Sequence, residues 1–239
     1  CGISLSVYPS SFNCSNIGTQ SVILTGEDPS GNIATCTSLV TIVDQTAPFI
    51  FCQSITVQLD ASGNVSVAAS QIDNGTGDNC GNFTLSLSPS SFTCANVGVN
   101  AVVLTAEDDY NNISTCNANI IVEDNVDPTP ICQDITVQLD ASGNASITPG
   151  DVDNGSSDAC GLLSLVVSPS SFTCLNVGGN PVVLTVTDNN NNVSTCGATV
   201  TIQDNVPPVI TCPSNITQNT DLNLCTAYVP VPPLTIYSD

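Results

Sequence analysis

The sequence predicts an all-β protein of tandem Ig-like β-sandwich repeats, each about 80 residues long, braced by disulfides and with no helices of note. Cysteines recur at a fixed step, because Cys14, Cys94 and Cys174 are 80 residues apart. Longer segments of sequence recur at the same step, and ITVQLDASGN begins at both Ile55 and Ile135. Short apolar runs alternate with polar residues, and no segment keeps a helical period. A period of this length is too long for a solenoid turn and suits a string of small domains, each with its own core.

The repeat that begins at Phe51 illustrates the expected elements in chain order. Ile55, Val57 and Leu59 alternate with polar residues, which predicts a half-buried strand ending at the Ala-Ser-Gly-Asn turn, 61–64. Further strands are expected at 65–67, 83–87, 102–104 and 116–122, separated by polar loops at 73–79 and 109–112. About seven short strands in such a span indicate a compact sandwich. A phenylalanine occupies the same slot of each repeat and is expected in the core: Phe12, Phe92 and Phe172.

The 80-residue step also predicts the domain boundaries. We expect a partial repeat with only the C-terminal strands at 1–46, complete repeats at 47–126 and 127–206, and a partial repeat with only the first two strands at 207–239. Half-sandwiches would expose strand edges that readily pair with another chain. Two interpretations stay open. The chain is a window from a longer array, or it is a protomer whose tail strands complete the head of the next protomer by strand addition.

The composition excludes several classes of function. The 239 residues include no Lys, Arg or His, against 21 acidic side chains. Nucleic acid and anionic membrane surfaces are therefore excluded as partners, because both require cationic side chains. No apolar run has transmembrane length, so membrane insertion is not expected. Catalysis by His, Lys or Arg is impossible, and small sandwiches lack the wide cleft that a paired-carboxylate glycosidase needs. We do not expect an enzyme.

The thirteen cysteines predict disulfides and an oxidising compartment, because the sequence has no His and no Cys-x-x-Cys pair to suggest zinc. In an Ig-like strand order the first, third and last strands start at one common end of the domain. This geometry predicts Cys14–Cys36, Cys52–Cys80, Cys94–Cys116, Cys132–Cys160 and Cys174–Cys196. A competing scheme, which joins Cys80 to Cys94 and Cys52 to Cys116, stays open.

Acidic linkers suggest calcium. Asp-x-x-x-Pro begins at Asp44, Asp124 and Asp204, again 80 residues apart, and resembles cadherin linkers, in which an acidic stretch before proline binds calcium. The strand order should bring the linker of one repeat to two loops of the next. This gathers Asp44, Asp73, Asp78, Glu107 and Asp108 at the first complete junction and Asp124, Asp127, Asp153, Asp158 and Asp188 at the following one. Hard oxygen ligands suit calcium. The alternative is that these carboxylates cap turns and keep the surface soluble.

Several segments resemble a known family. The stretch 207–216 with Cys225 after it is similar to the opening of a hyalin (HYR) repeat, as are Asp-Asn-Cys-Gly at 78–81 and the ending at 107–116. The VQLDASGN and SPSSFTC phrases resemble repeats of very large Bacteroidetes surface adhesins, including gliding-motility adhesins. The resemblance covers essentially the whole chain. It implies an Ig-like fold, export across the outer membrane, commonly by the type IX route, and adhesive or extension roles.

The chain departs from the family in its cysteines. The two complete repeats lack a counterpart of Cys225 and carry Cys94 and Cys174 instead, so the disulfide pairing of the family does not transfer.

Two functions follow from these observations. The first is structural: an extracellular stalk or filament of a bacterial cell-surface adhesin, with neighbouring repeats or protomers as partners. The second is direct recognition, in which the modules bind glycans or a cell-surface protein. Recognition predicts a patch of exposed aromatic and amide side chains that differs between repeats, whereas a stalk predicts near-identical repeats, as seen here.

Overall fold

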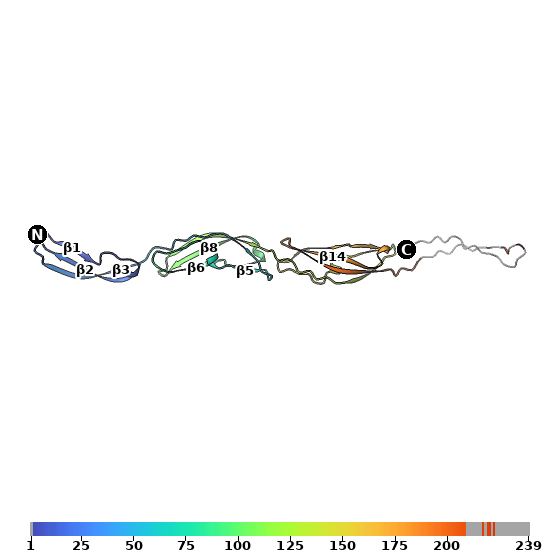
Figure 1. Cartoon of the computed structure of the whole chain (residues 1–239), viewed down its shortest axis with the longest axis horizontal. Coiled ribbons are helices and arrows are strands. Elements are labelled where there is room, and N and C mark those ends of the chain that lie inside the picture. The colour runs from blue at the N-terminus through green and yellow to red at the C-terminus, as the bar shows by residue number, and fades with distance from the viewer. Residues whose placement is uncertain (1, 209–216, 218, 221, 223–239) are drawn as a thin grey trace. The chain divides into compact units, whose positions relative to one another are not determined.

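The computed structural model describes residues 2–208, 217, 219, 220 and 222. The partial repeat expected at 207–239 therefore lies almost wholly outside the described residues. The chain divides into two compact units, Cys1–Asn125 and Val126–Asp239, and each is described by itself. Both are built from β-strands, which confirms the predicted class (Figure 1). In the described residues no helix is both long and apolar enough to cross a membrane.

The first unit opens with a three-stranded antiparallel sheet in the order β1-β2-β3. Its strands are β1 (Ser4–Tyr8), β2 (Gly18–Glu27) and β3 (Ile33–Ile42), with a short 3-10 turn at Cys14–Asn16. Apolar and polar residues alternate in β1, where Leu5 and Val7 lie between polar neighbours, whereas β2 contains a continuous apolar run at 22–24. The linker that contains Asp44 follows β3.

A complete sandwich follows in the same unit. Its elements are β4 (Ile55–Gln58), β5 (Asn64–Ser66), α1 (Ala69–Ile72), β6 (Phe83–Ser88), β7 (Ser91–Thr93), β8 (Gly98–Asp108) and β9 (Ile113–Glu123), with a 3-10 turn at Cys94–Asn96. One sheet has the order β4-β9-β8-β6, and β5 pairs with β7. The strand β4 runs parallel to β9, and the other pairs are antiparallel. Six strands thus replace the expected seven, and α1 is a single helical turn in a segment for which no helix was expected.

The second unit repeats this sandwich. Its elements are β10 (Ile135–Gln138), β11 (Asn144–Ser146), α2 (Pro149–Val152), β12 (Leu162–Ser168), β13 (Ser171–Thr173), β14 (Gly178–Asp188) and β15 (Val193–Gln203), with a 3-10 turn at Cys174–Asn176. The sheet order is β10-β15-β14-β12, with β11 paired to β13 and β10 parallel to β15. The segments of sequence that recur 80 residues apart therefore adopt the same topology in both repeats.

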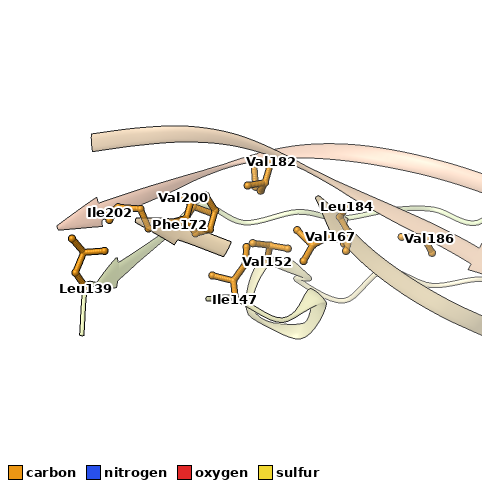
Figure 2. Close-up of a cluster of buried hydrophobic side chains, with 11 residues drawn as sticks. Leu139, Ile147, Val152, Val167, Phe172, Val182, Leu184, Val186, Val200 and Ile202 are labelled. Carbon is orange, nitrogen blue, oxygen red and sulfur yellow. The ribbon is translucent and has the colours of Figure 1, made fainter. Parts of the chain in front are cut away.

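The core of the second unit lies between its four-stranded sheet and the segment that contains α2 and β13 (Figure 2). Alternate residues of β14 and β15 point inward, among them Leu184 and Val200. Phe172 packs against them and is 2% exposed. Phe92 is buried at the equivalent position of the first unit, as expected, whereas Phe12 is half-buried.

The disulfides correct the main predicted pairing. The structure joins Cys14 to Cys80, Cys52 to Cys116 and Cys132 to Cys196. These pairs rule out the expected Cys14–Cys36, Cys52–Cys80, Cys94–Cys116, Cys132–Cys160 and Cys174–Cys196. The competing scheme is right about Cys52–Cys116 and wrong about Cys80–Cys94. Cys94 and Cys160 are likewise disulfide-bonded.

The parallel pairing of the first and last strands of each repeat is the physical reason for the difference. Ile55 on β4 is the partner of Ile120 on β9, so the residues just before them also lie close. Cys52 and Cys116 therefore meet, with Cα atoms 6.2 Å apart. Cys80 instead lies near Cys14 of the preceding sheet, with Cα atoms 5.0 Å apart.

Candidate metal site at the linker aspartates

Three carboxylates converge in the first unit. One oxygen from each of Asp44, Asp78 and Asp108 lies within 4.8 Å of the other two. Asp44 comes from the linker after β3, Asp78 from the loop after α1, and Asp108 from the last position of β8. The structure thus brings together three of the five residues that the sequence assigned to this junction.

Asp108 is buried and is held in a fixed orientation by the hairpin that it begins. Its Oδ1 accepts the backbone N–H groups of Tyr110 and Asn112, each at 2.8 Å, and its Oδ2 accepts the Asn112 side-chain amide at 2.7 Å. Burial alone would raise the pKa of Asp108, but the hydrogen bonds from Asn112 and Tyr110 outweigh it and lower the pKa. The carboxylate is therefore charged at neutral pH.

Asp44 and Asp78 are each satisfied at only one oxygen. Oδ1 of Asp44 accepts the Thr46 N–H at 3.0 Å, and Oδ1 of Asp78 accepts the Cys80 N–H at 2.8 Å. The Oδ2 atoms of both residues are buried and have no hydrogen-bond partner in the part of the chain that the structure describes. A buried carboxylate oxygen without a partner is costly, and like charges at this separation add repulsion. The sequence has no Lys, Arg or His that could offset this charge.

The donor set fits a hard divalent cation. Carboxylate oxygens are the preferred ligands of Ca²⁺, which accepts six to eight oxygens in flexible geometry, with carbonyls and water completing the shell. Asp44, Asp78 and Asp108 would hold the ion. Binding it would give the buried Oδ2 atoms of Asp44 and Asp78 the partner that the described residues do not supply. A bound ion would fasten the linker to two loops of the sandwich.

Sequence reasoning missed the part played by Asn112. Its side-chain amide donates to Asp108, and it also lies 3.4 Å from the backbone carbonyl of Asp44. The signal was present in the sequence, since an asparagine follows four residues after each equivalent aspartate. These pairs are Asp28 with Asn32, Asp108 with Asn112, and Asp188 with Asn192.

The other two residues assigned to this junction lie outside the cluster of three. Asp73 caps its own loop, because its Oδ1 accepts the backbone N–H of Thr76 at 2.9 Å and also the Thr76 hydroxyl. The hydrogen bond from the Thr76 side chain is the main reason that the pKa of Asp73 is lowered. Glu107 is half-buried on β8. At Asp73 the local geometry is that of the turn-capping alternative.

Within the second unit, two aspartates repeat the local arrangement. Oδ1 of Asp158 accepts the Cys160 N–H at 2.7 Å, as Asp78 does with Cys80. Asp188 is fully buried, and its Oδ1 accepts the backbone N–H of Asn192 at 2.8 Å.

The other residues that the sequence assigned to the second junction differ from one another in hydrogen bonding and burial. Oδ1 of Asp153 accepts the Ser156 N–H at 3.0 Å, and the side-chain hydrogen bond from Ser156 is the main cause that lowers the pKa of Asp153. Asp127 is exposed. Asp124 is buried just beyond β9, at the end of the first unit.

Comparison with known proteins gives no family assignment. No family model matches the chain, and no curated protein matches it. Among solved structures, cadherin domains 1–4 of protocadherin gamma B7 give a TM-score of 0.35 at 16% identity, covering 91% of this chain and 71% of that one. Domains 1–2 of human protocadherin-24 give 0.37 at 14% identity, covering 67% and 100%. At scores this low, the fold assignment rests on the strand pairing described above.

Proposed function

We propose that this chain is a structural segment of an extracellular adhesive array, in which calcium stiffens the junction between successive repeats. The cluster of Asp44, Asp78 and Asp108 carries the proposal, because two of its buried oxygens have no hydrogen-bond partner among the described residues. A cation there would tie the linker to the following sandwich. The disulfides support an oxidising, extracellular setting.

The wider setting that we propose is the stalk of a bacterial surface adhesin exported across the outer membrane. The support is the resemblance of the sequence to HYR-like repeats and to Bacteroidetes adhesins. The two complete repeats have near-identical sequence segments. This favours a spacer, because modules that each recognise a glycan would be expected to differ from one another in their exposed side chains. The proposed role is mechanical and involves no catalysis.

Calcium titration by calorimetry on the full chain, with thermal melts before and after chelation, tests this function. We expect saturable binding and a clear loss of thermal stability when calcium is removed. Magnesium at the same concentration should stabilise the chain less, because it demands a stricter octahedral shell. Absence of binding at millimolar calcium would refute the metal assignment and leave the Cys14–Cys80 disulfide and the hydrogen bond from Asn112 to the Asp44 carbonyl to hold the junction.

A further inference from the structure

A pair of exposed aromatic rings lies on the first complete repeat. Phe49 is 57% exposed and Phe51 is 59% exposed, and their ring centroids are 6.2 Å apart with the ring planes tilted by 56°. Phe92, in the core of the same repeat, is 1% exposed. The two outer rings therefore contribute little to the packing of the sandwich. Exposed aromatic groups that lie together are typical of binding surfaces.

A glycine makes room for one of the two rings. Phe49 and Gly77 exchange two backbone hydrogen bonds, from the Phe49 N–H to the Gly77 carbonyl at 2.9 Å and from the Gly77 N–H to the Phe49 carbonyl at 3.0 Å. The Phe49 ring lies against Gly77, because a Cβ atom added to this glycine would collide with Cζ of the ring. The position of the ring therefore depends on having no side chain opposite it.

The second complete repeat carries different residues at all three positions. Thr129 and Ile131 stand in place of the rings, and Ser157 stands in place of the glycine. The backbone pairs in the same way, since Thr129 and Ser157 exchange hydrogen bonds of 2.8 and 3.0 Å. Thr129 and Ile131 are exposed as well. The fold therefore accepts either set of residues, and the rings are a feature of one repeat that the sandwich itself does not require.

The charge around the rings selects the chemistry of a ligand. The segment that pairs with residues 49–52 includes Asp73, opposite Cys52, and Asp78 follows directly after Gly77. The sequence has 21 acidic side chains and no Lys, Arg or His. Its field attracts cations and repels anions, and the face of an aromatic ring also attracts a cation. The site is thus complementary to a positively charged group and disfavours a phosphorylated or sulfated one.

We infer that Phe49 and Phe51 form a docking surface for a partner protein that presents arginine side chains in an exposed segment. A guanidinium group is planar, always charged and weakly hydrated, so it stacks readily on aromatic faces. Two rings tilted against each other offer it two such faces. This surface adds recognition of a basic partner to the structural role proposed above. It does not rest on the metal site, because neither ring belongs to the carboxylate cluster.

A titration followed by NMR tests the surface directly. The full chain, labelled with ¹³C in its phenylalanine rings, is titrated at low ionic strength with the probe peptide acetyl-Gly-Arg-Gly-Arg-Gly-amide. We expect saturable shift changes at Phe49 and Phe51 and none at the buried Phe92 and Phe172. The same peptide with citrulline in place of arginine should bind at least about threefold more weakly, because it lacks the charge. No change at the two rings, or equal binding of the two peptides, would overturn the inference.

An exchange of residues between the repeats supplies a matched variant. Phe49→Thr, Phe51→Ile and Gly77→Ser together give the first complete repeat the residues of the second. The melting temperature should stay close to that of the parent, because both repeats share the same backbone pairing. Affinity for the arginine peptide should fall by about tenfold, since two aromatic contacts are lost. Unchanged affinity in this variant would refute docking on the rings.

The reverse exchange tests whether the three residues are sufficient. Thr129→Phe, Ile131→Phe and Ser157→Gly are introduced into the variant that has lost the original rings. The second complete repeat retains acidic residues at the equivalent positions, Asp153 and Asp158. Binding of the arginine peptide should therefore return. Failure to restore binding in a protein that melts like the parent would overturn the assignment to these rings.

A neutral oligosaccharide distinguishes a glycan from a basic protein as the ligand, because sugar rings also stack on aromatic faces. Maltotriose is titrated in parallel with the arginine peptide. We expect the peptide alone to shift Phe49 and Phe51, and its binding to weaken as the ionic strength rises. A response to maltotriose without one to the peptide would overturn the inference. A failed calcium titration would leave all of these outcomes unaffected.

Discussion

The disulfide between Cys14 and Cys80 closes a loop that contains both Asp44 and Asp78, with the two Cα atoms 5.0 Å apart. Asp78 lies two residues before Cys80, and its Oδ1 accepts the Cys80 N–H at 2.8 Å. The covalent bond therefore limits how far the linker carboxylate can move from the loop carboxylate. Disulfide and cation act on the same junction, and their contributions can be separated by substitution.

Removal of this disulfide should destabilise the first unit. The chain entropy of a closed loop with a sequence separation of 66 predicts that the double variant Cys14→Ser, Cys80→Ser loses about 4 kcal/mol of unfolding free energy. Urea denaturation in chelator measures this loss without any contribution from calcium. Cys36→Ser is the control, because Cys36 forms no disulfide with any described residue. Equal midpoints for the control and the double variant would contradict the prediction.

Neutralising one cluster carboxylate should have opposite effects with and without calcium. Asp78→Asn removes a charged ligand, so calcium affinity should fall by about tenfold or more. In chelator the same change should raise the melting temperature, because it relieves repulsion among three carboxylates. Calorimetry and thermal melts measure the two effects. Asp109→Asn, in an exposed loop position next to Asp108, should change neither. A loss of stability in chelator would indicate a purely structural role for Asp78.

Acid should destabilise the fold through the turn aspartates. The pKa of Asp73 is lowered from its ordinary value of 3.8, chiefly by the hydrogen bond from the Thr76 side chain. A lowered folded pKa contributes stability that is present above the unfolded pKa and is lost as the pH falls through the folded value. Melting temperatures in chelator should therefore drop below about pH 4. Asp73→Asn should make this drop shallower, and Asp109→Asn should not.

Core packing around Phe172 should dominate the stability of the second unit. Phe172→Ala removes a ring that is 2% exposed and should cost about 3–5 kcal/mol. Leu175→Ala, at a side chain that is 96% exposed, should cost almost nothing. Phe12→Ala should have a smaller effect than Phe172→Ala, because Phe12 is only half-buried. Denaturation midpoints measure all three, and a large loss for Leu175→Ala would contradict this packing.

The strands were predictable because a strand that is buried on one face alternates apolar and polar residues along the sequence. Ile55 and Val57 of β4, and Leu85 and Leu87 of β6, are the plainest cases. The disulfides were not predictable, because spacing alone does not reveal that β4 runs parallel to β9. That register brings Cys52 to Cys116 and leaves Cys80 for Cys14.

The candidate metal site was predictable in part for a similar reason. The linker aspartate and the hairpin aspartate follow directly from the strand order, and the structure brings Asp44 and Asp108 together with Asp78. Asp73 differs because a threonine three residues later competes for its carboxylate. Such a local hydrogen bond depends on the conformation of the loop, which the positions of acidic residues in the sequence do not reveal.

The parallel pairing of β4 with β9 has a consequence for a chain under tension. A repeat is pulled at the residue before its first strand and the residue after its last, and those two strands lie side by side, so the force shears their hydrogen bonds in parallel. The Cys52–Cys116 bond spans the same two strands and carries the force across from one to the other. The segment between these cysteines, with a sequence separation of 64, is bypassed and cannot unravel while the bond is intact. Each such repeat therefore has a fixed upper limit to its extension, set by covalent chemistry.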